Sequence, residues 1–74
     1  MSRRTFAGAV RTWSRAGRGP RAPRRWYYVE LVAANGEVET SVRYRTRAGR
    51  NKAAARMKAA HPRRALEREG PRDR

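Results

Sequence analysis

The sequence predicts an α+β fold built from a single ββα unit, an antiparallel hairpin packed on one helix, with disordered basic flanks at both ends. Two strand-like runs joined by a turn dipeptide occupy residues 26–45. An alanine-rich segment bounded by Thr46 and Pro62 follows, and the remaining segments are rich in arginine. The expected organisation is a flexible basic arm at 1–25, a ββα domain at 26–61 and a C-terminal tail at 62–74.

The first 25 residues contain eight arginines and no acidic side chain. The spacing of Phe6, Val10 and Trp13 matches one face of a short helix over residues 5–16, which we expect to be nascent because isolated helices of that length are marginal in water. Two interpretations remain open for it: a basic arm or membrane-surface helix, or a segment that packs over the domain. Residues 15–25 contain two prolines, two glycines and five arginines, which predicts a flexible cationic linker.

The hairpin is predicted from the dipeptide Asn35-Gly36 and from the alternation of side chains around it. Both residues tolerate positive φ, as a two-residue type I′ turn requires. Folding the chain at this turn collects apolar and strand-favouring side chains on one face. The facing pairs there are Ala33 with Val38, Leu31 with Thr40, Val29 with Val42 and Tyr27 with Tyr44. The other face carries Ala34 with Glu37, Val32 with Glu39, Glu30 with Ser41, Tyr28 with Arg43 and Trp26 with Arg45.

A helix is predicted for residues 47–60. Alanine is the strongest helix former, Thr46 suits the N-cap position, and Pro62 disfavours helical conformation at His61. An apolar stripe on the helix should pack on the apolar face of the hairpin. The stripe consists of Ala53, Ala54, Met57 and Ala60. In the tail that follows, we expect a helical turn around Leu66 at most, and fraying or disorder up to the C-terminus.

Composition narrows the classes of function. The chain has 74 residues with 20 Lys+Arg against 6 Asp+Glu, a formal net charge of +14. Self-repulsion of this size opposes compaction unless a polyanion neutralises it, so nucleic acid is the first expected partner. An anionic membrane surface or an acidic protein comes second, and a solvated surface without a partner is the remaining interpretation.

The same composition gives no sign of catalysis. Cysteine is absent and His61 is the single histidine, so neither a metal site nor a cofactor is expected. No nucleophile signature or glycine-rich phosphate loop is present, and an enzyme is not expected. No apolar run spans a bilayer and no secretory signal is visible, so the expected location is cytoplasmic, including association with the nucleoid.

The size of the expected core suggests self-association. A ββα unit of about 35 residues seldom folds alone without disulfides or a metal. We therefore expect a homodimer, in which two hairpins pair edge to edge or two helices share one core. The alternative is that the N-terminal apolar residues fold back as a third element.

Residues 26–60 resemble the YegP-type domain, a largely uncharacterised family of small ββα units that often occur in tandem. The matching residues are Leu31, Ala33, Asn35, Gly36, Val38, Tyr44, Arg47, Ala48, Ala54 and Met57. Arg50 departs from the pattern, since the family usually has a small residue there. The resemblance implies the ββα fold and, for a single unit, a dimer. The chain is also similar, more weakly, to the N-terminal arm-binding domain of tyrosine recombinases, which has a three-stranded sheet and one helix and binds DNA; a third strand is not predicted here.

A nucleic-acid site is predicted at the open end of the hairpin and along the helix. The outer face carries acidic side chains near the turn, which repel phosphates, and aromatic–arginine pairs at the open end, which suit stacking and cation–π contact. The predicted nucleic-acid-binding residues are Arg24, Arg25, Trp26, Tyr28, Arg43, Arg45, Arg47, Arg50, Lys52 and Arg56. For Trp26 and Tyr28 a second interpretation is open, in which they shield the sheet or form a dimer seam.

The function expected from the sequence is that of a small non-enzymatic nucleic-acid-binding accessory protein whose arginines contact the phosphate backbone. The alternative is a protein-interaction module that docks on an acidic partner protein. DNA and RNA are not distinguished at this level, and no sequence specificity is predicted.

Overall fold

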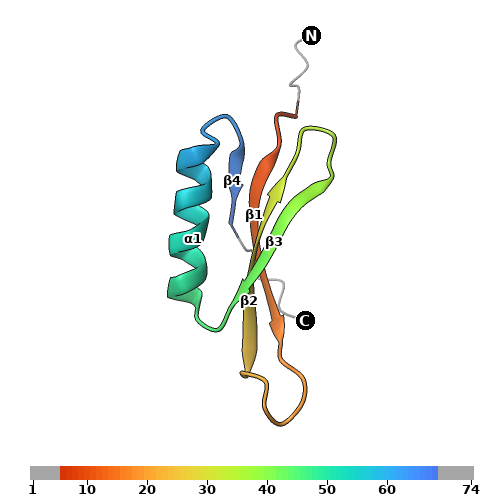
Figure 1. Cartoon of the computed structure of the whole chain (residues 1–74), viewed down its shortest axis with the longest axis vertical. Coiled ribbons are helices and arrows are strands. Elements are labelled where there is room, and N and C mark those ends of the chain that lie inside the picture. Colours follow the sequence, from red (N-terminus) through yellow and green to blue (C-terminus); the bar gives the residue numbers. More distant parts are fainter. Residues whose placement is uncertain (1–5, 69–74) are drawn as a thin grey trace.

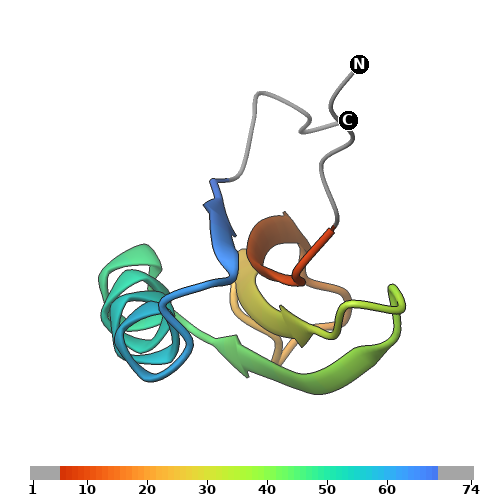
Figure 2. The ribbon, with the colours of Figure 1, turned by 90° about the horizontal axis from the view of Figure 1, so that it is seen from above.

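The computed structural model describes residues 6–68, which form a four-stranded sheet with one helix on one of its faces (Figures 1 and 2). The elements are β1 (Ala9–Ala16), β2 (Arg25–Val32), β3 (Val38–Tyr44), α1 (Arg47–Ala60) and β4 (Ala65–Glu67). The strand order is β3-β2-β1-β4, with β4 parallel to β1 and the other two pairings antiparallel. The predicted α+β class is confirmed, and the ββα unit is present as β2, β3 and α1.

The N-terminal segment forms a strand, so the predicted helix over residues 5–16 is wrong for residues 9–16. β1 pairs with β2 along its whole length and lies inside the sheet as a third antiparallel strand. The apolar spacing that suggested a helix is also compatible with alternation, because Val10 and Thr12 point to one face and Trp13 to the other. The structure has the strand, and in it Val10 is fully buried in the core.

The predicted flexible linker, residues 15–25, is instead the connection of the β1–β2 hairpin together with the two strand ends. Two backbone hydrogen bonds close this loop, from Gly17 N to Arg24 O (3.0 Å) and from Ala22 N to Gly19 O (3.3 Å). Gly17 is required there, because a Cβ atom would lie 1.9 Å from the carbonyl oxygen of Pro23. Glycine and proline thus build a specific loop here, although the same composition also describes a linker.

The register of the β2–β3 hairpin is confirmed over most of its length. Tyr27 faces Tyr44, and the pairing continues in the predicted register as far as Leu31 with Thr40. A bulge follows, so that Val38 lies opposite Val32 and not opposite Ala33.

The predicted type I′ turn is wrong. Gly36 has a φ of 89°, but Asn35 does not have a positive φ. Gly36 N donates to Ala33 O (2.9 Å), Ala33 N donates to Glu37 O (2.8 Å), and the Asn35 side chain accepts from Glu37 N (3.0 Å). This is a three-residue loop that ends in a left-handed glycine, and its extra residue explains why the register shifts by one beside it.

The helix has the predicted bounds and cap. Thr46 Oγ1 accepts a hydrogen bond from Gly49 N (3.1 Å). Ala54 is buried in a core cluster formed with residues of β1 and β2, and Ala53 and Met57 pack against it. Ala60, the fourth member of the predicted stripe, is exposed.

Residues after Pro62 form a further strand, so the predicted frayed or helical tail is wrong for residues 65–67. Arg64 N donates to His61 O (2.9 Å) in a turn, and Ala65 N donates to Gly8 O (3.3 Å) at the start of the parallel pairing with β1. Leu66 packs against the core cluster. The disordered flanks predicted at 1–5 and 69–74 lie outside the described residues.

The two unpredicted strands also change the argument for self-association. With β1 and β4 included, the folded unit covers residues 6–68 and no longer falls in the size range that requires a partner copy. The predicted fold-back of the N-terminal apolar residues describes the outcome better, since Val10 enters the core and Trp13 packs on the sheet.

Candidate nucleic-acid interface

The β1–β2 hairpin extends beyond the rest of the sheet. Its last two residue pairs, Arg15 with Trp26 and Ala16 with Arg25, lie beyond Tyr27, where the pairing of β2 with β3 ends. We call residues 15–26 the β1–β2 projection; in Figure 1 it reaches past the first turn of α1 at the lower end of the molecule. The first residues of α1 and the end of β3 lie beside its base.

Among the described residues, no acidic side chain lies at this end of the molecule. Residues 6–29 and 40–66 contain none. The arginines of the projection are Arg15, Arg18, Arg21, Arg24 and Arg25, and those beside its base are Arg43, Arg45 and Arg47. Such a concentration of one sign of charge produces a local positive potential.

The acidic side chains of the described residues lie toward the other end of the sheet, where the predicted register placed three of them, Glu30, Glu37 and Glu39. The fourth acidic side chain of the described residues is Glu67. Arg64 donates to the Glu39 carboxylate (2.6 Å), and this hydrogen bond, aided by the charges of Arg64 and His61, lowers the pKa of Glu39 although partial desolvation opposes it.

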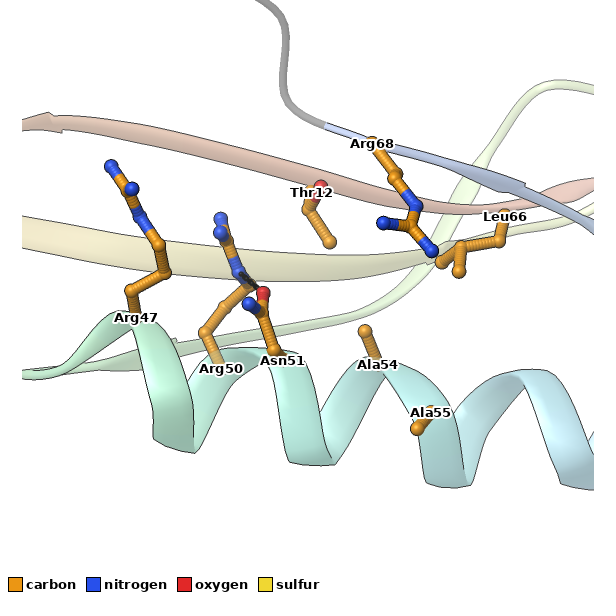
Figure 3. A pocket seen from close by; sticks show the side chains of 8 residues that line it. All are labelled: Thr12, Arg47, Arg50, Asn51, Ala54, Ala55, Leu66 and Arg68. Atoms are coloured by element: carbon orange, nitrogen blue, oxygen red, sulfur yellow. Dashed lines mark hydrogen bonds between the residues drawn. The ribbon is translucent and has the colours of Figure 1, made fainter.

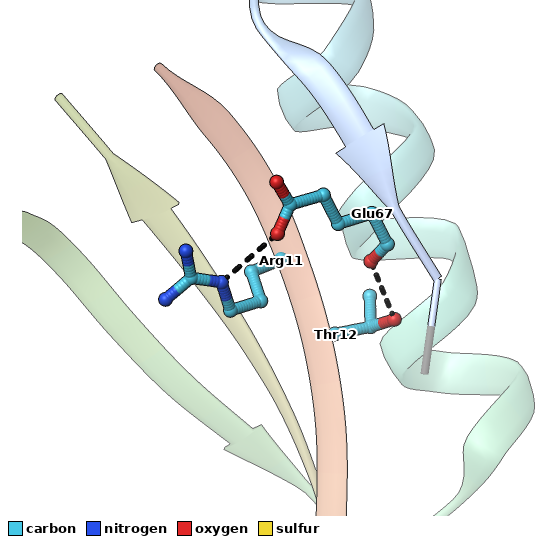
Figure 4. Close-up of polar contacts among 3 residues, drawn as sticks. All are labelled: Arg11, Thr12 and Glu67. Carbon is cyan, nitrogen blue, oxygen red and sulfur yellow. Dashed lines mark hydrogen bonds and ion pairs between the residues drawn. The ribbon is translucent and has the colours of Figure 1, made fainter. Parts of the chain in front are cut away.

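Glu67 is also paired, and Figure 4 shows both of its contacts. Arg11 Nε donates to its carboxylate (3.1 Å), and Thr12 Oγ1 donates to its main-chain oxygen (3.1 Å). Both contacts attach β4 to β1. Within residues 6–68, Glu39 and Glu67 therefore make their ion pairs away from the projection.

A cluster of aromatic rings and guanidinium groups covers the face of the sheet opposite α1. Trp13 of β1 stacks on Tyr28 of β2, with ring centroids 3.9 Å apart and planes 4° from parallel. The Arg43 guanidinium lies over the Trp26 ring at 4.0 Å, and that of Arg45 lies at 5.4 Å from the same ring. Arg15 adds a further contact, 5.6 Å from the ring of Tyr28.

This arrangement follows from strand pairing, since Trp13 faces Tyr28 on one side and Arg43 faces Tyr28 on the other. We call the cluster the arginine–aromatic surface; its members are Trp13, Arg15, Trp26, Tyr28, Arg43 and Arg45. A hollow beside it is lined by Arg15, Ala16, Arg18, Trp26 and Arg43. Three guanidinium groups and one indole therefore border a single opening at the base of the projection.

The ring of Tyr28 is not available as a platform for bases. Tyr28 is 8% exposed and lies beneath Trp13, so its predicted role as a stacking surface is wrong. Trp26 is half-buried, and one face of its ring is covered by Arg43. The rings support Arg15, Arg43 and Arg45, whose side chains are exposed.

Arg50 is a second correction to the predicted site. It is 3% exposed; it donates to the main-chain oxygen of Trp13 (3.2 Å) and to the side chain of Asn51 (2.8 Å), and it lies 5.6 Å from the ring of Tyr27. It holds α1 against β1 and does not belong to the surface.

A groove of about 360 Å³ lies between α1 and the strands (Figure 3). Arg47 and Arg50 extend into it from α1, and Arg68 extends into it from the end of β4. The groove is lined by Thr12, Arg47, Arg50, Asn51, Ala54, Ala55, Leu66 and Arg68. It is separate from the arginine–aromatic surface, because it lies on the helix side of the sheet.

The predicted site residues are thus divided among several surfaces. Trp26, Tyr28, Arg43 and Arg45 are brought together on the face opposite α1, and exposed Arg24 lies on the projection close to them. Arg25 points to the helix side, where it donates to Ser14 Oγ (3.1 Å). Arg47 lies at the helix start, 5.6 Å from the Tyr27 ring. Lys52 and Arg56 are exposed on the outer side of α1, away from the sheet.

Sequence reasoning missed the contribution of β1 to the site. Trp13 and Arg15 belong to the arginine–aromatic surface, and Arg18 and Arg21 are exposed on the projection. Arg11, Trp13 and Arg15 stand at every second position, and this alternation is the signal that could have placed Trp13 and Arg15 on one face of a strand.

Comparisons with protein-family models, with curated proteins and with solved structures return no match for the chain. Within residues 6–68, no helix has the length and apolar character needed to cross a bilayer.

Proposed function

We propose that the protein is a small non-enzymatic nucleic-acid-binding protein that contacts the phosphate backbone through the β1–β2 projection and the arginine–aromatic surface. The observation that carries the proposal is the convergence of exposed arginines from β1, β3 and the projection, at an end where residues 6–68 place no acidic side chain. Neutralising phosphates with such groups releases condensed counterions, which is the main source of sequence-independent affinity for nucleic acid.

The contacts with aromatic rings suit the arginines to this task. A guanidinium stacked on an indole keeps its N–H edge directed outward, and that edge matches the geometry of phosphate oxygens. Arg43 is held in this way by Trp26 at 4.0 Å. Part of the conformational entropy that a free arginine loses on binding is therefore already lost in the unbound protein.

The proposal includes an accessory role in the cytoplasm or at the nucleoid, where a polyanion neutralises the net charge. The same surface would also attract an acidic partner protein, which is the alternative function. Nucleic acid is favoured because the arginines are distributed along a projection, which suits an extended, evenly charged polymer better than a compact acidic patch.

A homodimer is proposed as the form in which two such surfaces act together. β3 is an edge strand of the sheet, and its Val38 and Val42 are 49% and 37% exposed. Antiparallel pairing of two β3 strands would close this open edge of the sheet. Light scattering during size-exclusion chromatography tests this: a monomeric mass at micromolar protein excludes the dimer.

A fluorescence-anisotropy titration of a labelled oligonucleotide over a range of salt concentrations tests the function. We expect micromolar or tighter binding, and about six phosphate contacts would give a slope of roughly −5 in a plot of log affinity against log salt for duplex DNA. Absence of binding near physiological salt contradicts the proposal. Binding of a defined acidic protein through the arginine–aromatic surface would then support the alternative.

A further inference from the structure

The β1–β2 projection is an ordered two-stranded ribbon with a defined tip. Gly17 and Arg24 close it with a hydrogen bond of 3.0 Å, and a β-turn from Gly19 to Ala22 forms the end. Pro20 occupies the second position of that turn, where its fixed φ favours the turn conformation. The side chains of Arg18, Arg21 and Arg24 are exposed around this tip.

The distribution of aromatic side chains argues against a single-stranded ligand. Proteins that bind single strands present aromatic rings on which successive bases stack. Here the ring of Tyr28 is covered by Trp13, and one face of Trp26 is covered by Arg43. The surface near the projection therefore presents guanidinium groups, which contact phosphates and base edges, and the ring of Tyr28 is too buried to serve as a platform for a base.

The dimensions of the projection fit the major groove of B-form DNA. Paired strands lie about 4.8 Å apart. A two-stranded ribbon with its side chains enters a major groove about 12 Å wide, whereas the minor groove is about 6 Å wide. The projection extends two residue pairs and a loop beyond β3, and at about 3.3 Å per residue this exceeds the groove depth of about 8.5 Å. The major groove of duplex RNA is too deep and narrow for side chains to reach the bases.

We propose that the protein selects duplex DNA over duplex RNA and single strands by placing the β1–β2 projection in the major groove, while the arginine–aromatic surface contacts the adjoining phosphates. The inference rests on the proposed function and adds the class of nucleic acid and the element that enters it. Arginines at the tip then lie where a guanidinium makes paired hydrogen bonds to guanine O6 and N7.

Competition of unlabelled nucleic acids against a labelled DNA duplex of about 20 base pairs, at one salt concentration, tests the choice of ligand. The competitors are the same duplex, the RNA duplex of that sequence and each DNA single strand. We expect the RNA duplex and the single strands to compete at least tenfold more weakly than the DNA duplex. Equal competition by single strands or RNA overturns the inference and leaves the proposed function standing, whereas no binding to any of them overturns both.

The role of the projection is tested with two variants that lose the same charge. The triple replacement R18A/R21A/R24A removes three exposed arginines of the tip, and K52A/R56A/R63A removes three exposed basic side chains elsewhere. We expect the tip variant to lose at least ten times more duplex affinity than the control, with both retaining the wild-type circular dichroism spectrum and melting temperature. Equal losses would show that only bulk charge matters and would overturn the role of the projection.

Two probes, one for each groove of DNA, test which groove the projection enters. Glucosylated 5-hydroxymethylcytosine fills the major groove, and netropsin fills the minor groove of A·T tracts. We expect glucosylation to weaken binding severalfold and netropsin to leave it unchanged. The reverse pattern would assign the projection to the minor groove and contradict the inference.

Discussion

At the scale of single residues, Arg50 shows how a charged side chain can belong to the core. Its guanidinium donates to the main-chain oxygen of Trp13 (3.2 Å) and joins α1 to β1 across a long separation in sequence. Its aliphatic stem packs along the buried surface while the charged head is satisfied by hydrogen bonds. A count of basic residues on the helix therefore overstates the number that can reach a ligand.

Replacing Arg50 with alanine should destabilise the fold. The change removes buried packing and leaves the Trp13 carbonyl without this donor, so the free energy of unfolding should fall by about 2–4 kcal/mol. Urea unfolding followed by circular dichroism measures the loss. The matched control is Arg56→Ala on the exposed side of the same helix, which should change stability by less than about 0.5 kcal/mol. Equal stabilities of the two variants would contradict the role given to Arg50.

Glu39 should make stability depend on pH in a defined direction. Its pKa is lowered from an ordinary value of 4.5, first by the hydrogen bond from Arg64. A carboxylate with a depressed folded-state pKa stabilises the protein above its unfolded-state pKa, and this contribution is lost as the pH falls through the folded-state pKa.

The variant Glu39→Gln should therefore melt below the wild type at neutral pH, and the difference should shrink as the pH falls below about 4.5. Melting temperatures recorded between neutral pH and pH 3 measure this. Glu37→Gln, at the exposed turn, serves as the control. A wild-type advantage over Glu39→Gln that grows on acidification would have the wrong sign.

At the scale of elements, the sequence predicts those parts whose local signals agree with their tertiary surroundings. The cap at Thr46 and the alanine content locate α1 correctly, and alternation around Gly36 gives the register of β2 and β3 up to the bulge. The turn type was missed because an Asn-Gly pair also serves a three-residue loop, in which asparagine keeps a negative φ.

β1 and β4 were missed for different physical reasons. The apolar residues of β1 are compatible with both helical and strand spacing, and only the burial of Val10 between β2 and α1 selects the strand. β4 has three residues, and its pairing with β1 depends on contacts far away in sequence, such as that of Glu67 with Arg11. The candidate site was therefore half predicted: Arg24, Arg25, Arg43 and Arg45 were identified, but Arg15, Arg18 and Arg21 were assigned only to a linker.

The loop of the projection gives a test at this scale. In Gly17→Ala the new methyl group would lie 1.9 Å from the Pro23 oxygen, so the loop backbone must move and the tip arginines with it. We expect at least fivefold weaker binding to duplex DNA, while the amide resonances of Val29 and Leu31 stay unchanged. Gly19→Ala is the matched control: its φ of 93° adds about 1–3 kcal/mol of strain, but no atom lies within 4 Å of the new Cβ. A loss of binding in Gly19→Ala that equals that of Gly17→Ala would contradict a specific loop shape.

At the scale of the whole molecule, the described residues separate charge along the sheet. One end carries the glutamates, of which Glu39 pairs with Arg64 and Glu67 with Arg11, and the other end carries the arginines of the projection. The four-stranded sheet supports this separation because β1 and β2 are long enough to extend past β3 and α1 (Figure 1). A formal net charge of +14 makes the protein a polycation, and the fold determines on which surface the positive side chains are concentrated.

Chemical-shift mapping by nuclear magnetic resonance tests this claim most directly. Uniformly ¹⁵N-labelled protein is titrated with a DNA duplex, and the amide and arginine Nε–H signals are followed. We predict the largest changes in residues 15–26 and at Arg43 and Arg45, with small changes in the turn at residues 33–37. Changes that centre on Lys52 and Arg56, or that spread evenly over all arginines, would contradict the account.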